Sequence, residues 1–157
     1  MPTIELTTTI AAPADRVFDL SRSIDLHLDS TAHTGERAVG GVVTGLIGLN
    51  EEVTWRARHF GIWQELTSRI TALDRPEHFR DSQVRGAFAR FDHDHYFDDL
   101  DPDGTVMRDR FDFNSPFGPL GSVVDTLILT RYMRAFLTER NRVIKEAAES
   151  TQWKKYL

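Results

Sequence analysis

Two histidines separated by a single residue are the part of this sequence best suited to chemistry. His93 and His95 lie in the alternating stretch Phe91-Asp92-His93-Asp94-His95-Tyr96-Phe97, so both imidazoles would leave the same face of a β-strand. Asp109 lies on a second alternating strand, and the turn residues Asp101-Pro102-Asp103-Gly104 would pair the two strands as a hairpin. The pattern therefore predicts a carboxylate beside two imidazoles, a combination in which histidine transfers a proton and the carboxylate orients it.

The same histidines allow a metal site as a second interpretation. A third ligand would have to come from His59, Asp81 or Asp109, and no zinc-protein spacing is recognisable. The chain has no cysteine, which excludes disulfides, thiolate nucleophiles and cysteine-based zinc sites. We therefore expect no metal and no cofactor. His93 and His95 are then either core histidines satisfied by polar neighbours or the polar anchor at the end of an apolar pocket.

An acidic turn resembles the start of a calcium-binding loop. Asp99, Asp101, Asp103 and Gly104 have the spacing that opens an EF-hand. The match fails further along, because Arg110 stands where the bidentate glutamate should be and strands are predicted on both sides. The segment is predicted to be a solvated hairpin turn.

Glycines recur from Gly40 to Gly48 in an otherwise apolar segment. The segment lacks the Lys-Ser/Thr of a phosphate loop and the strand-to-helix context of a dinucleotide fingerprint, so nucleotide binding is not expected. Glycine-rich backbone with few polar anchors is weakly held, which predicts a mobile loop at a cavity portal, with Val43, Leu46 and Ile47 near an apolar ligand. The alternative is an irregular edge packed on the core.

The composition is that of an ordinary globular protein. Of the 157 residues, 40% are hydrophobic and 27% are charged, and this size suits one domain over residues 1–157. No apolar run reaches the roughly 18 residues that span a bilayer, and no signal peptide is recognisable, so we expect a cytoplasmic protein without stable membrane insertion. The net charge of −5 leaves no basic footprint for nucleic acid. These features do not determine the oligomeric state.

Hydrophobic periodicity and turn residues predict an antiparallel sheet followed by a helix. Residues 3–10 are rich in β-branched side chains, Pro13 opens a short helix, and Ser23 caps a second one. A strand is predicted at 33–39, and regularly spaced turn residues divide 51–114 into five more. About thirty residues of helix then close the chain, since one apolar stripe follows helical spacing. The stripe comprises Leu129, Tyr132, Met133, Phe136, Leu137, Val143, Ile144 and Ala147.

This order of elements and three local strings resemble the SRPBCC superfamily, also called START-like. The strings are Glu52-Val53-Thr54-Trp55-Arg56-Ala57-Arg58-His59-Phe60, the strand from Phe91 to Phe97, and Pro116-Phe117-Gly118-Pro119-Leu120-Gly121, which resemble a bacterial, ligand-binding and polyketide-cyclase-like branch. The resemblance implies an α+β helix-grip fold: a curved seven-stranded antiparallel sheet around a long C-terminal helix, with two short helices after the first strand. It also implies a cavity between sheet and helix.

Strand alternation and the resemblance together select candidate ligand-binding residues on the inner faces of the sheet and helix. Only the resemblance favours an inward orientation of Asp81 and Gln83. The selected residues are Trp55, His59, Asp81, Gln83, Phe91, His93, His95, Asp109, Phe111, Val124 and Leu127. Catalytic residues are not determined by the sequence, and His93, His95 and Asp109 are the candidates.

Three functions are compatible with these expectations. The first is binding or carriage of a small hydrophobic molecule, such as a lipid, an isoprenoid or an aromatic metabolite. The second is a cyclase- or dehydratase-like enzyme in which His93 or His95 moves a proton and Asp109 orients it. The third is a protein-interaction module with a vestigial pocket. A roomy cavity lined by a histidine and a carboxylate would be compatible with the second function. A cavity volume near zero would favour the third.

Overall fold

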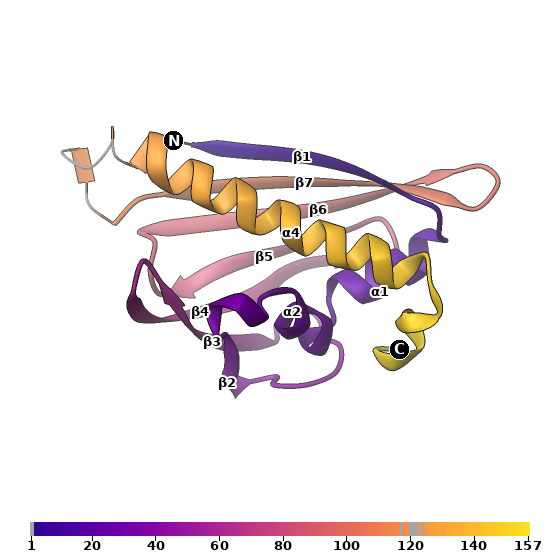
Figure 1. Ribbon diagram of the computed structural model, residues 1–157, viewed down its shortest axis with the longest axis horizontal. Helices are drawn as coiled ribbons and strands as arrows, with labels where there is room; N and C mark the ends of the chain where they lie inside the picture. Colours follow the sequence, from indigo (N-terminus) through magenta and orange to yellow (C-terminus); the bar gives the residue numbers. More distant parts are fainter. Residues whose placement is uncertain (1, 117, 120–122, 124) are drawn as a thin grey trace.

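A curved antiparallel sheet wraps around the C-terminal helix α4 in the computed structural model (Figure 1). The structure describes residues 2–116, 118–119, 123 and 125–157. Seven strands follow one another in the order β1-β7-β6-β5-β4-β3-β2, and each neighbouring pair is antiparallel. The strands are β1 (Thr3–Ile10), β2 (Arg37–Gly41), β3 (Glu52–His59), β4 (Ile62–Asp74), β5 (His78–Arg85), β6 (Arg90–Leu100) and β7 (Gly104–Asn114). The predicted helix-grip fold is confirmed.

Two short helices follow β1, as the sequence predicts. Helix α1 (Ala14–Ser21) begins directly after Pro13 and packs against β6, β7 and α4. Helix α2 (Ile24–Ser30) is capped by Ser23, whose Oγ accepts a hydrogen bond from the Leu26 N–H at 3.2 Å. The apolar side of α1 is buried, which fixes this helix against the sheet; its buried residues are Ala14, Val17, Phe18 and Leu20.

The C-terminal helix is shorter than predicted. Helix α4 spans Thr130–Ala148, a π-helical turn at Asp125–Leu129 (η2) precedes it, and a 3-10 turn at Thr151–Lys155 (η3) follows it. The expectation of thirty continuous helical residues is wrong because the backbone leaves α geometry at both ends, which changes the number of residues per turn. Part of the predicted stripe is buried, namely Leu137, Ile144 and Ala147, and the rest is half-buried.

Strand β2 begins and ends later than the predicted strand at 33–39. A 3-10 turn, Ala32–Thr34 (η1), occupies the start of that range, and Gly40 and Gly41 belong to the strand. Gly41 has a φ of 70°, and a Cβ there would collide with the carbonyl group of Glu52. Only glycine permits this close approach of β2 to β3.

The segment after Gly41 is held by more polar contacts than the sequence suggested. The Asp25 carboxylate accepts hydrogen bonds from the Thr44 hydroxyl at 3.0 Å and from the Gly45 N–H at 2.8 Å. The Gly45 carbonyl accepts one from the Ile24 N–H at 2.9 Å, and Ile47 is buried. The expectation of few polar anchors is therefore wrong, and these contacts match an irregular edge packed on the core.

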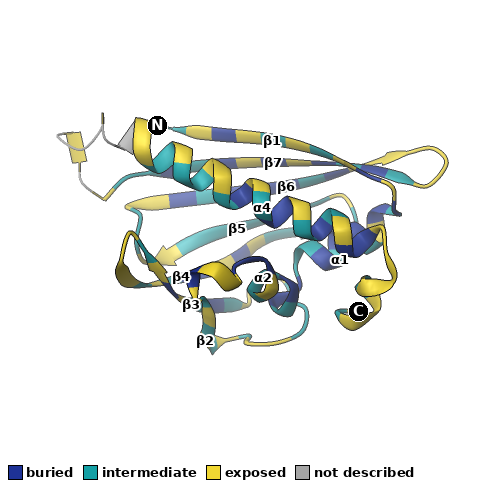
Figure 2. Cartoon of the chain, viewed as in Figure 1, coloured by how far each residue is buried: buried dark blue, intermediate teal, exposed yellow. Residues whose placement is uncertain are grey.

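The core consists of two apolar clusters with polar residues between them. Strand β6 passes from Phe91 in one cluster, through His93 and His95, to Phe97 in the other. Strand β7 passes through the same levels in the opposite direction along the chain, and helix α4 passes through them in the same direction as β6. Buried and exposed residues are interspersed along α4 (Figure 2), as expected for a helix with one side against the sheet. We call the residues at this level the polar layer: Asp81, His93, His95, Asp109, Arg140 and Asn141.

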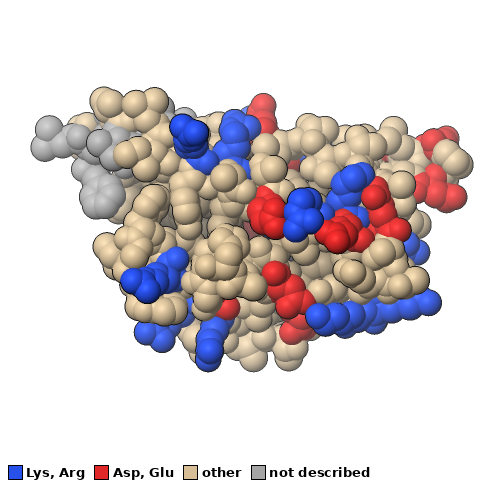
Figure 3. All heavy atoms as spheres, viewed as in Figure 1, with Lys and Arg blue, Asp and Glu red and all other residues tan. Residues whose placement is uncertain are grey.

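The outward face of α4 carries interspersed acidic and basic side chains (Figure 3). Arg142 contacts Glu139 at 2.8 Å and Glu146 at 2.7 Å, and Lys145 contacts Glu149 at 2.6 Å. These pairs at three- and four-residue spacing support the helix on its hydrated side. Within the described part of the chain, no helix is long and apolar enough to cross a bilayer.

Candidate functional site

A cavity of about 450 Å³ lies between the inner face of the sheet and α4. Its wall is mainly apolar and comes from both the sheet and the helix. Apolar contributors include Ile47, Val53, Trp55, Ala57, Leu66, Ile70, Phe79, Phe88, Phe91, Phe111, Leu129, Met133, Phe136 and Leu137. Ligand pockets typically have volumes of roughly 300–1,000 Å³, so a small organic molecule would fit.

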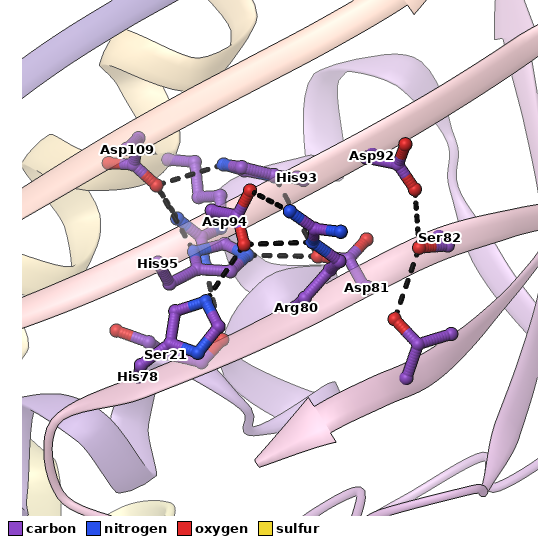
Figure 4. Close-up of polar contacts among 12 residues, drawn as sticks. Ser21, His78, Arg80, Asp81, Ser82, Asp92, His93, Asp94, His95 and Asp109 are labelled. Atoms are coloured by element: carbon purple, nitrogen blue, oxygen red, sulfur yellow. Dashed lines mark hydrogen bonds and ion pairs between the residues drawn. The ribbon is translucent and has the colours of Figure 1, made fainter. Parts of the chain in front are cut away.

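Part of the polar layer lies on this wall, namely Asp81, His93, His95 and Arg140. Figure 4 shows the contacts of Asp81, His93, His95 and Asp109. His93 and His95 project from β6 with ring centroids 3.8 Å apart, between Asp81 on β5 and Asp109 on β7. His93 Nε2 is 2.9 Å from Asp109 Oδ1, and His95 Nε2 is 2.9 Å from Asp81 Oδ1. The remaining ring nitrogens lie farther away: His95 Nδ1 is 3.1 Å from Asp109 Oδ1, and His93 Nδ1 is 3.8 Å from Asp81 Oδ1. Each imidazole therefore lies between two carboxylates.

Asp109 lies behind the histidines, one step away from the cavity wall. Its Oδ2 accepts a hydrogen bond from Asn141 Nδ2 at 2.6 Å, and Arg140 Nη1 lies 3.6 Å from its Oδ1. Arg140 also donates to Asn141 Oδ1 at 3.0 Å and to the Ser21 carbonyl at 3.1 Å. Asp109 thus connects β6, β7 and α4 through one buried carboxylate.

The contacts of the polar layer favour ionised carboxylates and a neutral His93. Burial alone would raise the pKa of Asp109, but its contacts with His93 and His95 hold that pKa well below the usual value. Burial also opposes ionisation of Asp81, yet the hydrogen bond with His95 lowers the pKa of Asp81. Burial and the neighbouring His95 lower the pKa of His93, although both carboxylates act in the opposite direction. At neutral pH His93 is therefore available as a base.

A second polar group lines the cavity near β2 and β3. His59 Nδ1 is hydrogen-bonded to the Tyr132 hydroxyl, and His27 Nε2 contacts Glu36 Oε1. The His27 ring also packs on Trp55, with ring centroids 4.3 Å apart. Burial lowers the pKa of His59 and raises the pKa of Tyr132, so both side chains favour their neutral forms. An apolar ligand in the cavity would meet polar groups at two places.

Most of the residues selected from the sequence lie on the cavity wall. These are Trp55, His59, Asp81, Phe91, His93, His95 and Phe111. Asp109 lies behind the wall, where it contacts the lining residues His93, His95 and Arg140. Val124 lies outside the described residues.

Gln83 and Leu127 are placed away from the cavity wall, contrary to expectation. The Gln83 amide donates to the Phe88 carbonyl at 2.8 Å and accepts from the Phe88 N–H at 3.2 Å, so it closes the hairpin between β5 and β6. Leu127 is 68% exposed on the π-helical turn, while Ile128 and Leu129 line the cavity. Leu127 and Leu129 are two residues apart, which places them on opposite sides of the helical turn, so Leu129 takes the inward position.

Arg140 and Asn141 were missed by the sequence interpretation although both are buried in the polar layer. A signal was present, because Arg140 follows Leu137 by three residues and precedes Ile144 by four. That spacing puts Arg140 on the inner face of α4. A polar residue on a buried helix face needs a partner, and Asp109 is the corresponding inward carboxylate of the sheet.

A third polar cluster, around Asp94, lies on the opposite face of the sheet. Asp94 is 2% exposed, accepts two hydrogen bonds from Arg80 at 2.8 Å and contacts His78 Nε2 at 2.8 Å. These contacts lower the pKa of Asp94 despite its burial. Arg80 and His78 thus neutralise a buried carboxylate away from the cavity. Substitutions in this cluster can serve as controls for substitutions in the polar layer.

Comparison with protein families establishes where the chain belongs. A model of the family described as polyketide cyclase / dehydrase and lipid transport matches residues 1–149. The chain is a member of this family. A comparison with curated protein sequences found no match.

Solved structures share the family's fold at low sequence identity. TTHA0849 from Thermus thermophilus is 16% identical, with a TM-score of 0.71 and coverage of 94% of this chain and 99% of the other. A START superfamily protein from Mycobacterium smegmatis is 10% identical, with a TM-score of 0.70 and coverage of 94% and 97%. Norcoclaurine synthase from Thalictrum flavum, in complex with dopamine and hydroxybenzaldehyde, is 13% identical, with a TM-score of 0.64 and coverage of 92% and 87%. At these identities the likeness concerns the fold alone.

Proposed function

We propose that the cavity binds a small, largely apolar molecule that carries at least one polar group. The observation that carries this proposal is the cavity of about 450 Å³, whose mainly apolar wall is interrupted by the polar layer. Binding sites commonly combine apolar walls with a few convergent polar groups in this way. Lipids, isoprenoids and aromatic metabolites match this description, and the proposed contacts are Trp55, His59, Asp81, Phe91, His93, His95 and Phe111.

A cavity-filling substitution tests this proposal. Ala57 is 3% exposed and lines the cavity, so Ala57→Trp places an indole in the space that a ligand would occupy. We expect this variant to bind the neutral fluorescent probe N-phenyl-1-naphthylamine about tenfold or more weakly than the wild type in a fluorescence titration. Arg58→Trp adds the same side chain on the opposite, exposed face of β3 and should leave the affinity unchanged. Equal affinities for all three proteins would contradict binding in the cavity.

A second candidate function is favoured by the arrangement of His93, His95 and Asp109. Two imidazoles at the cavity wall with a carboxylate behind them match a base and its orienting group, as a cyclase- or dehydratase-like reaction would require. The family includes such enzymes by its description, and norcoclaurine synthase has the same fold. The roomy cavity weighs against the third candidate, an interaction module with a vestigial pocket.

The polar layer should discriminate between ligands with and without a hydroxyl group. We expect His93→Phe to weaken binding of 1-naphthol by about 1–3 kcal/mol, because a buried hydrogen bond is lost. Binding of naphthalene should change much less. Calorimetric or fluorescence titrations of both ligands measure this difference. Equal losses of affinity for 1-naphthol and naphthalene would contradict the role of His93 as a polar anchor.

A further inference from the structure

We propose that Asp81, His93 and His95 bind one divalent transition-metal ion at the cavity wall. This proposal goes beyond ligand binding and reverses the expectation from the sequence, which considered these residues as metal ligands and expected no metal. One ligand atom from each residue lies within 4.8 Å of the others. Two imidazoles and one carboxylate suit Zn²⁺ and neighbouring first-row ions.

The candidate ligand atoms are those that face Asp81. Asp81 Oδ1 is 2.9 Å from His95 Nε2 and 3.8 Å from His93 Nδ1. Zinc binds nitrogen and carboxylate oxygen at about 2.0–2.2 Å, so one ion can contact donors separated by such distances after small side-chain rotations. The three donors come from adjacent strands, β5 and β6, whose hydrogen bonds fix the backbone beneath them.

Asp109 is placed to orient both imidazoles toward the ion. The ring nitrogens that face away from Asp81 approach Asp109 Oδ1, His93 Nε2 at 2.9 Å and His95 Nδ1 at 3.1 Å. If both rings carry their hydrogen on this side, their lone pairs point toward Asp81. A metal-binding histidine commonly donates its other N–H to a carboxylate in this way, and that contact fixes the tautomer.

The surroundings of His95 are a second, independent indication of a metal site. Its Nδ1 is buried and makes no hydrogen bond of normal geometry with any described group, although Asp109 Oδ1 is 3.1 Å away. A neutral His95 has one N–H for two facing carboxylates, so one of its nitrogens must turn a lone pair toward a carboxylate oxygen. A cation between His95 Nε2 and Asp81 removes this conflict, because the N–H can then point to Asp109.

The charge balance of the polar layer also favours a cation. Asp81 and Asp109 bring two carboxyl groups into the layer, and Arg140 is the cationic side chain that the described contacts place beside Asp109, with Nη1 3.6 Å from Oδ1. Two carboxyl groups thus share one guanidinium group in a buried place, where charges without a close partner are costly. On the opposite face of the sheet, by contrast, Arg80 pairs directly with Asp94.

The proposed ion would be accessible from the cavity. Asp81, His93 and His95 all line the wall, and the Asp81 side chain is 22% exposed. Three protein ligands leave at least one coordination position, as in catalytic rather than structural zinc sites. That position would accept an oxygen or nitrogen atom of a molecule bound in the cavity.

Metal titration of the full chain tests this proposal without any organic ligand. The protein is stripped with a chelator and titrated with Co²⁺, followed by absorption, and with Zn²⁺, followed by calorimetry. We expect one equivalent of each ion to bind. Asp81→Asn and His95→Gln should each weaken binding about 100-fold or more, and Asp109→Asn about 10–100-fold, the range for residues that orient a ligand. His78→Asn, which removes a histidine from the Asp94 cluster, should bind as the wild type does.

Circular dichroism melting of each metal-free variant separates loss of ligands from loss of fold. Asp81→Asn is nearly isosteric, so it provides a folded test even if a histidine variant does not fold. No saturable binding by the wild type would overturn the proposal, as would equal affinity in Asp81→Asn or an equal loss in His78→Asn. The metal titration contains no fluorescent probe, and the probe titration contains no metal. The metal-site proposal and the ligand-binding proposal can therefore fail independently of each other.

Discussion

Replacing Asp109 by alanine is expected to lower the free energy of unfolding by about 3–5 kcal/mol. The substitution removes the acceptor of His93 and Asn141 and leaves Arg140 without its nearby carboxylate. None of these three residues is more than 5% exposed, so water cannot replace the lost partner without rearrangement of the core. Urea denaturation followed by circular dichroism measures the change.

Asp98→Ala provides the matched control for this prediction. Asp98 lies on the neighbouring strand β6 and pairs with Arg108 at 2.8 Å, but their side chains are 57% and 48% exposed. Exposed pairs of this kind contribute less than about 1 kcal/mol. Similar losses of unfolding free energy in the two variants would mean that the contacts of Asp109 do not stabilise the core as described.

Phe18→Ala is expected to cost about 3–5 kcal/mol of unfolding free energy. Phe18 on α1 is fully buried, and its ring meets Phe79 and Phe97 edge-on at centroid distances of 5.4 and 5.2 Å. Its truncation would leave a cavity between α1 and the sheet. Phe60→Ala is the control, because Phe60 is 58% exposed and its removal should change stability by less than about 1 kcal/mol. The difference between the two denaturant midpoints decides the outcome.

The fold was predictable because its signals are local and repeated. Turn residues separate the strands at regular intervals, Ser23 caps α2, and one parity of β6 carries Phe91, His93, His95 and Phe97 inward. The breaks in helical geometry were not predictable. A π turn has no simple periodic signature, so the predicted helix included the residues before Thr130. Leu127 was expected on the wall but is exposed, since its two-residue spacing from Leu129 puts it on the outer side.

The candidate site was predictable only in part. Register alone brings His95 opposite Asp109 in the pairing of β6 and β7, as the sequence implied. The positions of Asp81 and Gln83 depend on the irregular pairing of β4 and β5 and on a hairpin closed by the Gln83 side chain. The contacts of Arg140 and Asn141 with Asp109 depend on how α4 crosses the sheet, which no local pattern specifies.

Native mass spectrometry of the purified chain tests the central claim of a ligand-binding cavity most directly. The wild type, Arg58→Trp and Ala57→Trp would each be measured after addition of N-phenyl-1-naphthylamine. We expect the wild type and Arg58→Trp to retain one probe molecule per chain, and Ala57→Trp to appear mainly as the bare chain because its indole fills the cavity. A wild type without bound probe, or equal retention by Ala57→Trp, would contradict the assignment of the cavity as the binding site.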